Sequence, residues 1–428
     1  MNTIINPNKS SWTQLLERPT QTVDDIESTV LQVFDDVSRN GDKAISKYTE
    51  KFDSCKLDSA VVTPEEVEQA SSLVSPELKE AIQQSKSNIY AFHKAQKTEK
   101  VQVETVKGVK CWQEKRPIEK VGLYIPGGTA PLFSTILMLV VPAQIAGCKE
   151  IILCTPPNSE GKVANEILYT ANLCGVTKII KVGGIQAIAG LTFGTETIPQ
   201  VYKIFGPGNQ FVTVAKQIST KYGVAIDMPA GPSELLIVAD DTANPAYVAS
   251  DLLSQAEHGT DSQVILVSTS KCLIEKVSKE VGTQLAVIPR KDIATQAIAN
   301  SKLIYVENDE IALEMINEYG PEHFIVCVKN EDLYVNRIVN AGSVFIGNYT
   351  PESAGDYASG TNHTLPTNGF SKAYSGVNLD SFTKAITFQK ITKEGILSIG
   401  KTIELMAEAE GLQAHKNSVT LRLKDLEA

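Results

Sequence analysis

The sequence predicts an α/β fold with two largely parallel sheets, a helical N-terminal segment and a small helical C-terminal tail. Three observations predict it. Apolar residues recur at helical spacing through the first hundred residues, short apolar runs alternate with helical segments from about Val121, and a further helical segment follows Pro366. Strands and helices in alternation are typical of βαβ units, in which the strands run parallel.

The N-terminal segment shows clear helix signals. Ile26, Val30, Phe34 and Val37 form one apolar stripe, and Thr63-Pro64-Glu65-Glu66 is a capping box with proline at the first helical position. Another helix begins after Ser75, and we interpret His93 beside its apolar stripe as a surface histidine.

Nine short apolar runs are expected to be strands, and helices that end at Gly175, Gly194, Gly223 or Gly320 separate several of them. Nine strands over this length fit two sheets better than one. The predicted strands are Val121–Ile125, Ile151–Cys154, Ile179–Val182, Val201–Phe205, Leu235–Val238, Val264–Val267, Leu303–Val306, Phe324–Val328 and Val344–Ile346.

Composition limits the class of protein. The chain has 428 residues and a net charge of −10 without a long basic run, so nucleic acid and anionic membranes are poor partners. No secretory signal is evident at the N-terminus, and the longest apolar run, Phe133–Gly147, is too short for a membrane span. Seven cysteines without a C-x-x-C motif argue against a disulfide framework or a cysteine-bound zinc. We therefore expect a cytoplasmic protein.

The stretch Gly347–Pro366 has neither a helical nor a strand period, so it is predicted to be a long loop. A loop of this length inside a compact domain is usually functional or disordered. It holds Asp356 and His363, which alone could equally be a turn carboxylate and a solvated ring.

Three glycine-rich turns follow strands: the first contains Tyr124, the second Gln186 and the third Asn209. Glycine at this place lets backbone amides approach a phosphate at the start of the next helix. None is a full G-x-G-x-x-G, and each alone is more often a tight connection. Asp227 lies roughly where a ribose-binding acid would be.

The remaining histidines also lie at element ends beside polar residues. Gln255 and His258 share a face at the end of a helix, although a histidine there can simply interact with the helix dipole. Glu322 and His323 precede a strand and could form a general base or a surface pair. Oxygen- and imidazole-rich ligands without cysteine suit Zn²⁺, Mn²⁺ or Co²⁺, so the residues predict a metal site beside a dinucleotide crevice.

These motifs resemble the histidinol dehydrogenase family almost from end to end, and no position that the family uses departs from its pattern. The loop and the QAEH segment are the most specific matches. The motifs are GLYIPGGTAPLFST, VGGIQAIAGLTFGT, FGPGNQFV, AGPSE, LLSQAEHG, GPEH and PESAGDYASGTNHTLPT.

The resemblance implies an NAD-dependent enzyme with one Zn²⁺ per subunit. Such an enzyme oxidises L-histidinol to L-histidine, the last step of histidine biosynthesis, through bound L-histidinal and with two NAD⁺. It further implies a set of site residues: Gln255, His258, Asp356 and His415 as metal ligands; His323 as general base and Glu322 as activator of water; Ser233, His363 and Glu410 as further substrate contacts; and Tyr124, Gln186 and Asn209 as NAD contacts.

The resemblance also implies two incomplete Rossmann-like domains with small terminal pieces, and a homodimer with shared active sites. On this basis we expect an N-terminal arm over residues 1–22 and a metal-bearing catalytic domain over 23–120 plus 236–375. We further expect an NAD-side domain over 121–235 and a helical tail over 376–428.

Three other functions remain open on the residues alone. A thiol-dependent aldehyde dehydrogenase could use Cys327, although its apolar surroundings favour a buried structural cysteine. A zinc hydrolase that needs no nucleotide is the second, and a non-catalytic metal-stabilised binding protein is the third.

Overall fold

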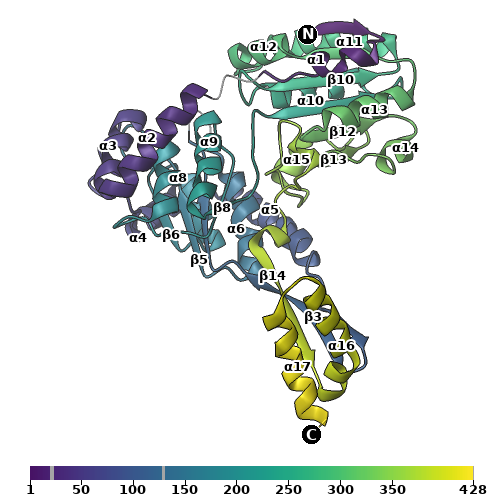
Figure 1. The fold of residues 1–428 in the computed structure, drawn as a ribbon. Coiled ribbons are helices and arrows are strands. Elements are labelled where there is room, and N and C mark those ends of the chain that lie inside the picture. The colour runs from purple at the N-terminus through teal and green to yellow at the C-terminus, as the bar shows by residue number, and fades with distance from the viewer. Residues whose placement is uncertain (20–23, 128–130, 428) are drawn as a thin grey trace. The chain divides into compact units, whose positions relative to one another are not determined.

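The structure is a computed structural model that describes residues 1–19, 24–127 and 131–427. Its α/β fold confirms the predicted class, and the chain forms two compact units (Figure 1). The first unit contains Met1–Gln96 and Ile118–Ser381, and the second contains Lys97–Pro117 and Phe382–Ala428. The expected boundary between residues 22 and 23 lies outside the described residues, and the other expected domain boundaries stay predictions.

A five-stranded parallel sheet in the first unit has the strand order β6-β5-β4-β7-β8. The chain runs outward from β4 to β6 on one side and later from β7 to β8 on the other. In a doubly wound sheet, such a reversal opens a crevice at the carboxyl ends of the strands. The strands are β4 (Lys120–Tyr124), β5 (Glu150–Cys154), β6 (Lys178–Ile180), β7 (Lys203–Phe205) and β8 (Ala225–Ile226).

Apolar helices cover this sheet. Helix α6 (Phe133–Ala146) is buried along most of its length because it packs against both α5 (Pro76–Ala95) and α7 (Asn165–Cys174). The long apolar run is therefore a core helix, and no helix in the described ranges has the length and hydropathy to cross a membrane. The other helices between these strands are α7 (Asn165–Cys174), α8 (Gly184–Phe193) and α9 (Gln210–Ser219), with a 3₁₀ turn η2 (Thr220–Tyr222).

A six-stranded sheet, also parallel, has the order β1-β11-β10-β9-β12-β13. Its edge strand β1 comes from the start of the chain and pairs with β11, with Asn2 opposite Lys302. The central strands are buried on both faces, which explains their continuous apolar sequences. The strands are β1 (Asn2–Ile5), β9 (Glu234–Ala239), β10 (Gln263–Ser268), β11 (Lys302–Tyr305), β12 (His323–Cys327) and β13 (Ser343–Ile346).

A further set of helices accompanies the six-stranded sheet. Helices α10, α11 and α12 pack against one another and against β10. The elements are η1 (Lys9–Ser11), α1 (Trp12–Leu15), α10 (Pro245–Ala256), α11 (Lys271–Leu285), α12 (Lys291–Ala299), α13 (Asp309–Tyr319), α14 (Glu331–Val335), α15 (Glu352–Tyr357) and η3 (Phe370–Lys372). The 3₁₀ turn η4 (Leu379–Phe382) instead lies beside β7, where Lys203 donates to the carbonyl oxygen of Ser381 at 2.8 Å.

All nine predicted strands are present, with ends that differ by at most two residues from the expected ones. Their division between two sheets is also confirmed. The prediction that Gly347–Pro366 is entirely a loop was wrong in part, because α15 lies within it.

The N-terminal segment is helical as predicted, with α2 (Asp24–Asn40), α3 (Asp42–Asp53), α4 (Pro64–Leu73) and α5 (Pro76–Ala95). The capping box at the start of α4 is confirmed in both directions, with the Thr63 amide donating to Glu66 at 2.8 Å. The interpretation of His93 as a surface residue was wrong. The ring is fully buried because α6 and the segment around Asn362 cover this face of α5.

The second unit contains an antiparallel sheet that the sequence analysis did not predict. Its order is β14-β3-β2, so a strand from residues 383–391 pairs with one from residues 109–117. Helices α16 and α17 pack against each other as the predicted tail. The elements are β2 (Val101–Val106), β3 (Val109–Pro117), β14 (Thr383–Ile391), α16 (Lys393–Ala409) and α17 (Gln413–Glu427).

Candidate active site

The best candidate for an active site lies at the amino ends of β9 and β12 in the six-stranded sheet. These strands pair directly, with His323 opposite Leu235, so Glu322 and Glu234 lie side by side at the edge. Helix α10 runs back between β9 and β10 and delivers Gln255 to the same edge. Doubly wound sheets usually bind ligands at the carboxyl ends of strands, so this site is at the opposite end.

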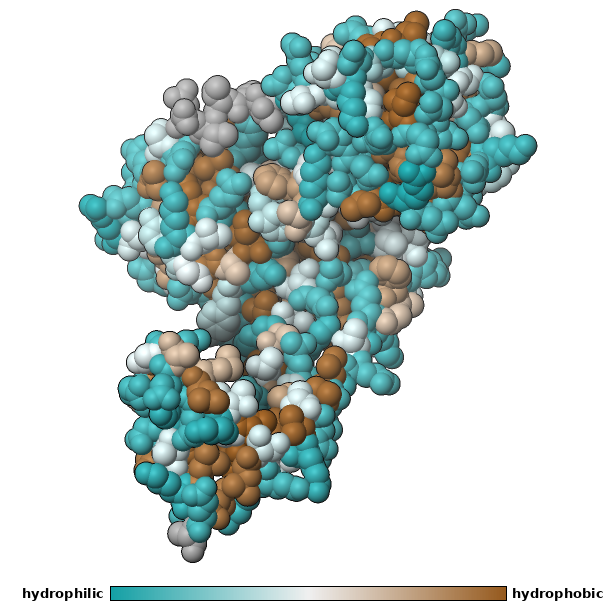
Figure 2. All heavy atoms as spheres, turned by 45° about the vertical axis from the view of Figure 1, so that its right-hand side comes forward, coloured by the Kyte–Doolittle hydropathy of each residue, from teal (hydrophilic) through white to brown (hydrophobic). Residues whose placement is uncertain are grey.

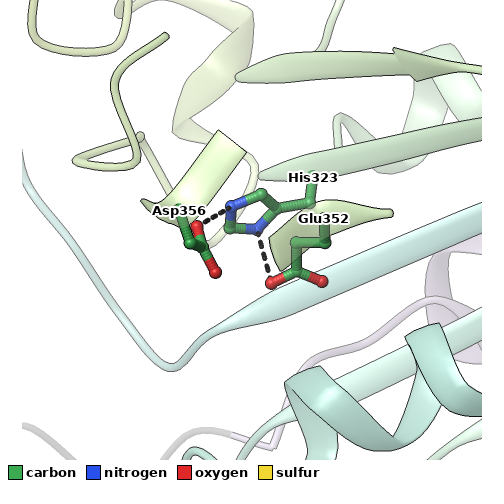
Figure 3. A group of neighbouring side chains, drawn as sticks. All are labelled: His323, Glu352 and Asp356. Atoms are coloured by element: carbon green, nitrogen blue, oxygen red, sulfur yellow. Dashed lines mark ion pairs between the residues drawn. The ribbon is translucent and has the colours of Figure 1, made fainter. Parts of the chain in front are cut away.

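His323 is the centre of this site and is only 4 % exposed. Its Nδ1 lies 3.6 Å from Glu322 Oε2 and 3.8 Å from Glu352 Oε1, and its Nε2 lies 3.9 Å from Asp356 Oδ1. Figure 3 shows the ring between the Glu352 and Asp356 carboxylates. Burial alone would lower the pKa of His323, but the surrounding carboxylates raise it to about 10.

Glu352 is a site residue that the sequence analysis missed. It is 1 % exposed, and burial raises its pKa well above the usual value. Burial also raises the pKa of Asp356, four residues later. On a helix, this spacing puts both carboxylates on one face. The four-residue spacing of Glu352 and Asp356 is visible in the sequence. Because the segment was predicted to be a loop, helical spacing was not considered there.

His363 lies on the other side of Asp356, with 3.7 Å between its Nδ1 and Asp356 Oδ1. Its Nε2 lies 3.3 Å from the hydroxyl of Thr135 in α6. Burial, with smaller contributions from His323 and His258, lowers the pKa of His363 to about 3. A neutral ring at physiological pH can donate one hydrogen bond and accept another.

Gln255 and His258 both lie at this cluster. The Gln255 amide is fully buried and lies 3.4 Å from both Glu322 Oε2 and His323 Nδ1. His258 is close enough for its charge to act on His363. Ser233 immediately precedes β9 and is half-buried. Residues up to about 130 positions apart in the sequence, from Ser233 to His363, thus lie in one cluster.

The cluster fits a divalent cation. His323, Glu352 and Asp356 each offer one ligand atom, and these three atoms lie within 4.8 Å of one another. His323 Nε2 and Glu352 Oε2 are buried and have no hydrogen-bond partner among the described residues. Buried polar atoms are rarely left without a partner, and several carboxylates around one imidazole carry negative charge that a cation would offset.

The three glycine-rich turns meet at the carboxyl edge of the five-stranded sheet, where a crevice is expected. Tyr124 ends β4, and its hydroxyl accepts a hydrogen bond from the Gly184 amide at 3.1 Å. Asn209 caps α9 and is exposed. Of the first turn, Gly128 lies outside the described residues.

Gln186 in the second turn has a buried acceptor without a partner among the described residues. Its Nε2 donates to Asp53 at 3.1 Å, whereas its buried Oε1 has no partner in the described part of the chain. A side chain on Gly184 would lie 3.0 Å from that oxygen. Glycine therefore keeps the space beside an unused acceptor open.

Asp227 has a structural explanation instead of a ligand-binding one. Its carboxylate forms a buried ion pair with Lys216 at 2.5 Å and accepts the Gly206 amide at 2.8 Å. Asp227 therefore holds the backbone of the third turn in place.

Glu410 and His415 belong to the second unit, where both are exposed. Glu410 is the C-cap of α16 and His415 lies in the first turn of α17. Their part in the site stays a prediction.

The fold and the site together define an α/β enzyme with a histidine–carboxylate centre at one sheet and nucleotide-type turns at another. Comparison with known proteins narrows this class. The sequence model described as histidinol dehydrogenase matches residues 16–423. This chain therefore belongs to the histidinol dehydrogenase family, whose members are enzymes of histidine biosynthesis.

Named relatives agree over the full length. The chain is 56% identical to histidinol dehydrogenase from Bacteroides thetaiotaomicron over 426 residues, which covers 100% of both chains. It is 52% identical to that of Shigella dysenteriae serotype 1 over 431 residues, covering 99% and 98%. The crystal structure of histidinol dehydrogenase from Elizabethkingia anophelis superposes with a TM-score of 0.98 at 56% identity, covering 100% and 99%.

Proposed function

We propose that this enzyme oxidises L-histidinol to L-histidine in two successive two-electron steps. In the first, the alcohol loses a hydride to NAD⁺ and a proton to a base, which gives L-histidinal. In the second, water adds to the aldehyde and a second hydride reduces a second NAD⁺. The observation that carries this proposal is the buried Glu322–His323 pair, surrounded by carboxylates at the amino ends of β9 and β12.

The roles of the pair follow from their placement. His323 takes the proton of the hydroxyl group, since an imidazole suits general base catalysis near neutral pH. Glu322 lies beside it and accepts the Glu234 amide at 2.8 Å, so its carboxylate is fixed where it can orient and deprotonate water. Burial of both side chains keeps bulk water away from the aldehyde.

Substrate and cofactor are held by residues around this pair. Ser233, His363 and Glu410 would contact the substrate, and the neutral ring of His363 can hydrogen-bond an imidazole or an amine. NAD⁺ would lie along the carboxyl edge of the five-stranded sheet against Tyr124, Gln186 and Asn209. The unpartnered Oε1 of Gln186 supports that placement.

One zinc ion per subunit would be held by Gln255, His258 and Asp356, with His415 from the second unit. Bound there, it would fix the amino alcohol through both oxidations and offset the carboxylate charge around His323. The carboxylates of Glu352 and Asp356 support a cation at this place, and the buried Glu352 Oε2 has no hydrogen-bond partner among the described residues.

A homodimer with shared sites is the proposed assembly. The second unit exposes large apolar side chains on α16 and α17 and in the turn between them, and Figure 2 shows apolar surface gathered there. Such patches mark protein interfaces. The residues are Leu397, Leu405, Met406, Leu412 and Leu421, which are 42 to 62% exposed.

The decisive experiment measures NADH absorbance with purified protein, L-histidinol and NAD⁺. Two NADH per histidinol, with L-histidine as product, are expected. No NADH from an intact, metal-loaded protein would reject the proposal, as a hydrolase or a binding protein would form none.

Metal removal is a second test. A chelator is expected to abolish activity, and Zn²⁺, Mn²⁺ or Co²⁺ should restore it because the ligand set is rich in oxygen and imidazole. Metal content is measured by atomic emission alongside turnover. Full activity in a metal-free preparation would contradict the metal assignment.

A further inference from the structure

A buried ion pair lies directly behind the Glu322–His323 pair. Arg18, from the N-terminal arm, binds Glu234 with two hydrogen bonds: Nε to Oε1 at 2.5 Å and Nη2 to Oε2 at 2.9 Å. The two side chains are 14% and 2% exposed. Glu234 Oε1 also accepts the amide of Asn368 at 2.6 Å. Two planar groups joined in this way hold one orientation.

The backbone of Glu234 connects this ion pair to the site. Its amide donates to Glu322 Oε2 at 2.8 Å, and its carbonyl oxygen lies 3.2 Å from His323 Nδ1. Both proposed catalytic groups therefore take their positions from one residue at the start of β9. A shift of Glu234 would move the hydrogen-bond partners of both.

Arg18 also contacts the segment that leads into β12. Its Nη2 donates to the carbonyl oxygen of Tyr319 at 2.9 Å, and its guanidinium lies 4.0 Å from the centre of the Tyr319 ring. Tyr319 ends α13, three residues before Glu322. One guanidinium thus binds both chain segments from which the site is built.

We propose that Arg18 is a positioning residue for the dehydrogenase reaction, acting through Glu234 and Tyr319 on the Glu322–His323 pair. The proposal rests on the proposed roles of that pair. Lysine cannot replace it fully, because an ammonium group cannot form the forked contact or lie flat on the tyrosine ring. Removal of Arg18 leaves a buried carboxylate without its partner, which displaces the start of β9.

The test compares variants of the arm by steady-state kinetics. R18M should lower kcat roughly 10- to 100-fold, the range expected for misplaced catalytic groups. The KM for NAD⁺ should stay within about twofold because the NAD residues lie on the other sheet. R18K should recover part of kcat. The R18M/E234Q double variant should be no worse than the poorer single variant, since both changes break one link.

Lys9 provides a matched control on the same arm. It pairs with Glu314 of α13 at 2.7 Å, but both side chains are more than half exposed and neither contacts Glu234. K9M should therefore leave kcat and both KM values unchanged. A loss in K9M as large as in R18M would mean that the arm matters only as a whole, and would overturn the specific role of Arg18.

Chemical rescue separates positioning from folding. A cavity of about 310 Å³ lies beside Arg18 and is also lined by Trp12, Tyr319 and Lys372. In R18A, a few millimolar ethylguanidinium should enter it and restore kcat, whereas ethylammonium should restore clearly less. Wild-type kcat in R18A, or rescue of the melting temperature without rescue of kcat, would overturn the proposal. If wild-type protein forms no NADH, the proposed function fails instead.

Discussion

His323 lies among more negative charge than one imidazole can balance. Glu322, Glu352 and Asp356 all approach its ring, and together they hold its pKa at about 10. A histidine that stays protonated cannot accept a proton from an alcohol. Additional positive charge beside the ring would lower that pKa toward neutral, which is the residue-level argument for the proposed cation.

Glu322→Gln should impair the second oxidation more than the first. Only the second step needs an activated water, and the amide keeps the shape of the carboxylate without its basicity. With L-histidinal as substrate the variant should be at least about 100-fold slower than wild type, within the range for loss of a general base. Stopped-flow absorbance with L-histidinol should still show the first hydride transfer. Equal losses in both steps would mean that Glu322 only orients His323.

Cys327→Ser should turn over at close to the wild-type rate. The thiol lies at the end of β12, is 3% exposed, and burial raises its pKa to about 12, so it is no nucleophile at neutral pH. A hydroxyl in this apolar core should lower the free energy of unfolding by about 1–3 kcal/mol. Kinetics and denaturant unfolding measure the two effects. A folded variant without turnover would favour the thiol mechanism.

Among single residues, the sequence analysis singled out those whose types are rare. His258, His323 and His363 stood out because the chain has only five histidines. Glu352 did not, as it is one of many acidic residues and its environment arises only when α15 packs against α10. His93 was misplaced because the sequence cannot show which later segment will cover a helix face.

Among the elements, the turn after β7 shows how closely the backbone of the five-stranded sheet is packed. Gly206 has a φ of 120°, and a Cβ there would overlap the carbonyl oxygen of Tyr124. Its amide donates to Asp227 and its carbonyl accepts Lys216, so the turn cannot move aside. Position 206 therefore requires glycine for two reasons: its φ is positive, and there is no space for a Cβ.

Gly206→Ala should raise the KM for NAD⁺ at least about tenfold, because the displaced turn carries Asn209 toward a wrong position. Fluorescence titration measures the accompanying loss of affinity for NADH. Gly223→Ala is the control: its φ is 83°, but nothing lies within 4 Å of the added Cβ. It should cost about 1–2 kcal/mol of stability from backbone strain and leave NADH affinity unchanged. Equal affinities for NADH in the two variants would mean that the turn after β7 is not part of the cofactor site.

Strands and helices of the first unit were predictable because their periods are strong and their glycine ends are regular. The antiparallel sheet of the second unit was not predicted. Strand β14 pairs with β3 across more than 260 residues of chain, and β2 is exposed along its length. Local sequence carries little information about such a long-range partner, and an exposed strand lacks the apolar run that marked the others.

At the scale of the whole molecule, the proposed shared site can be tested by mixing two variants that are each impaired alone. His415→Ala changes the second unit and Glu322→Gln changes the first. If the tail acts on the partner, each heterodimer holds one intact site, and a statistical mixture should regain roughly a quarter of wild-type activity. Subunit exchange is followed by native mass spectrometry. Confirmed exchange without recovered activity would mean that each tail serves its own subunit.

The pairing of β1 with β11 affects how the enzyme forms as it leaves the ribosome. One hydrophobic cluster on the five-stranded sheet takes its buried residues from positions 26 to 224, so this cluster can form while synthesis continues. Strand β1 is made first, but its partner begins at Lys302. At about 5–20 residues per second the strand waits roughly 15 to 60 s for it. Arg18 meets its second partner, Tyr319, later still, and a nascent chain holds no Glu322–His323 pair before β12 has been translated.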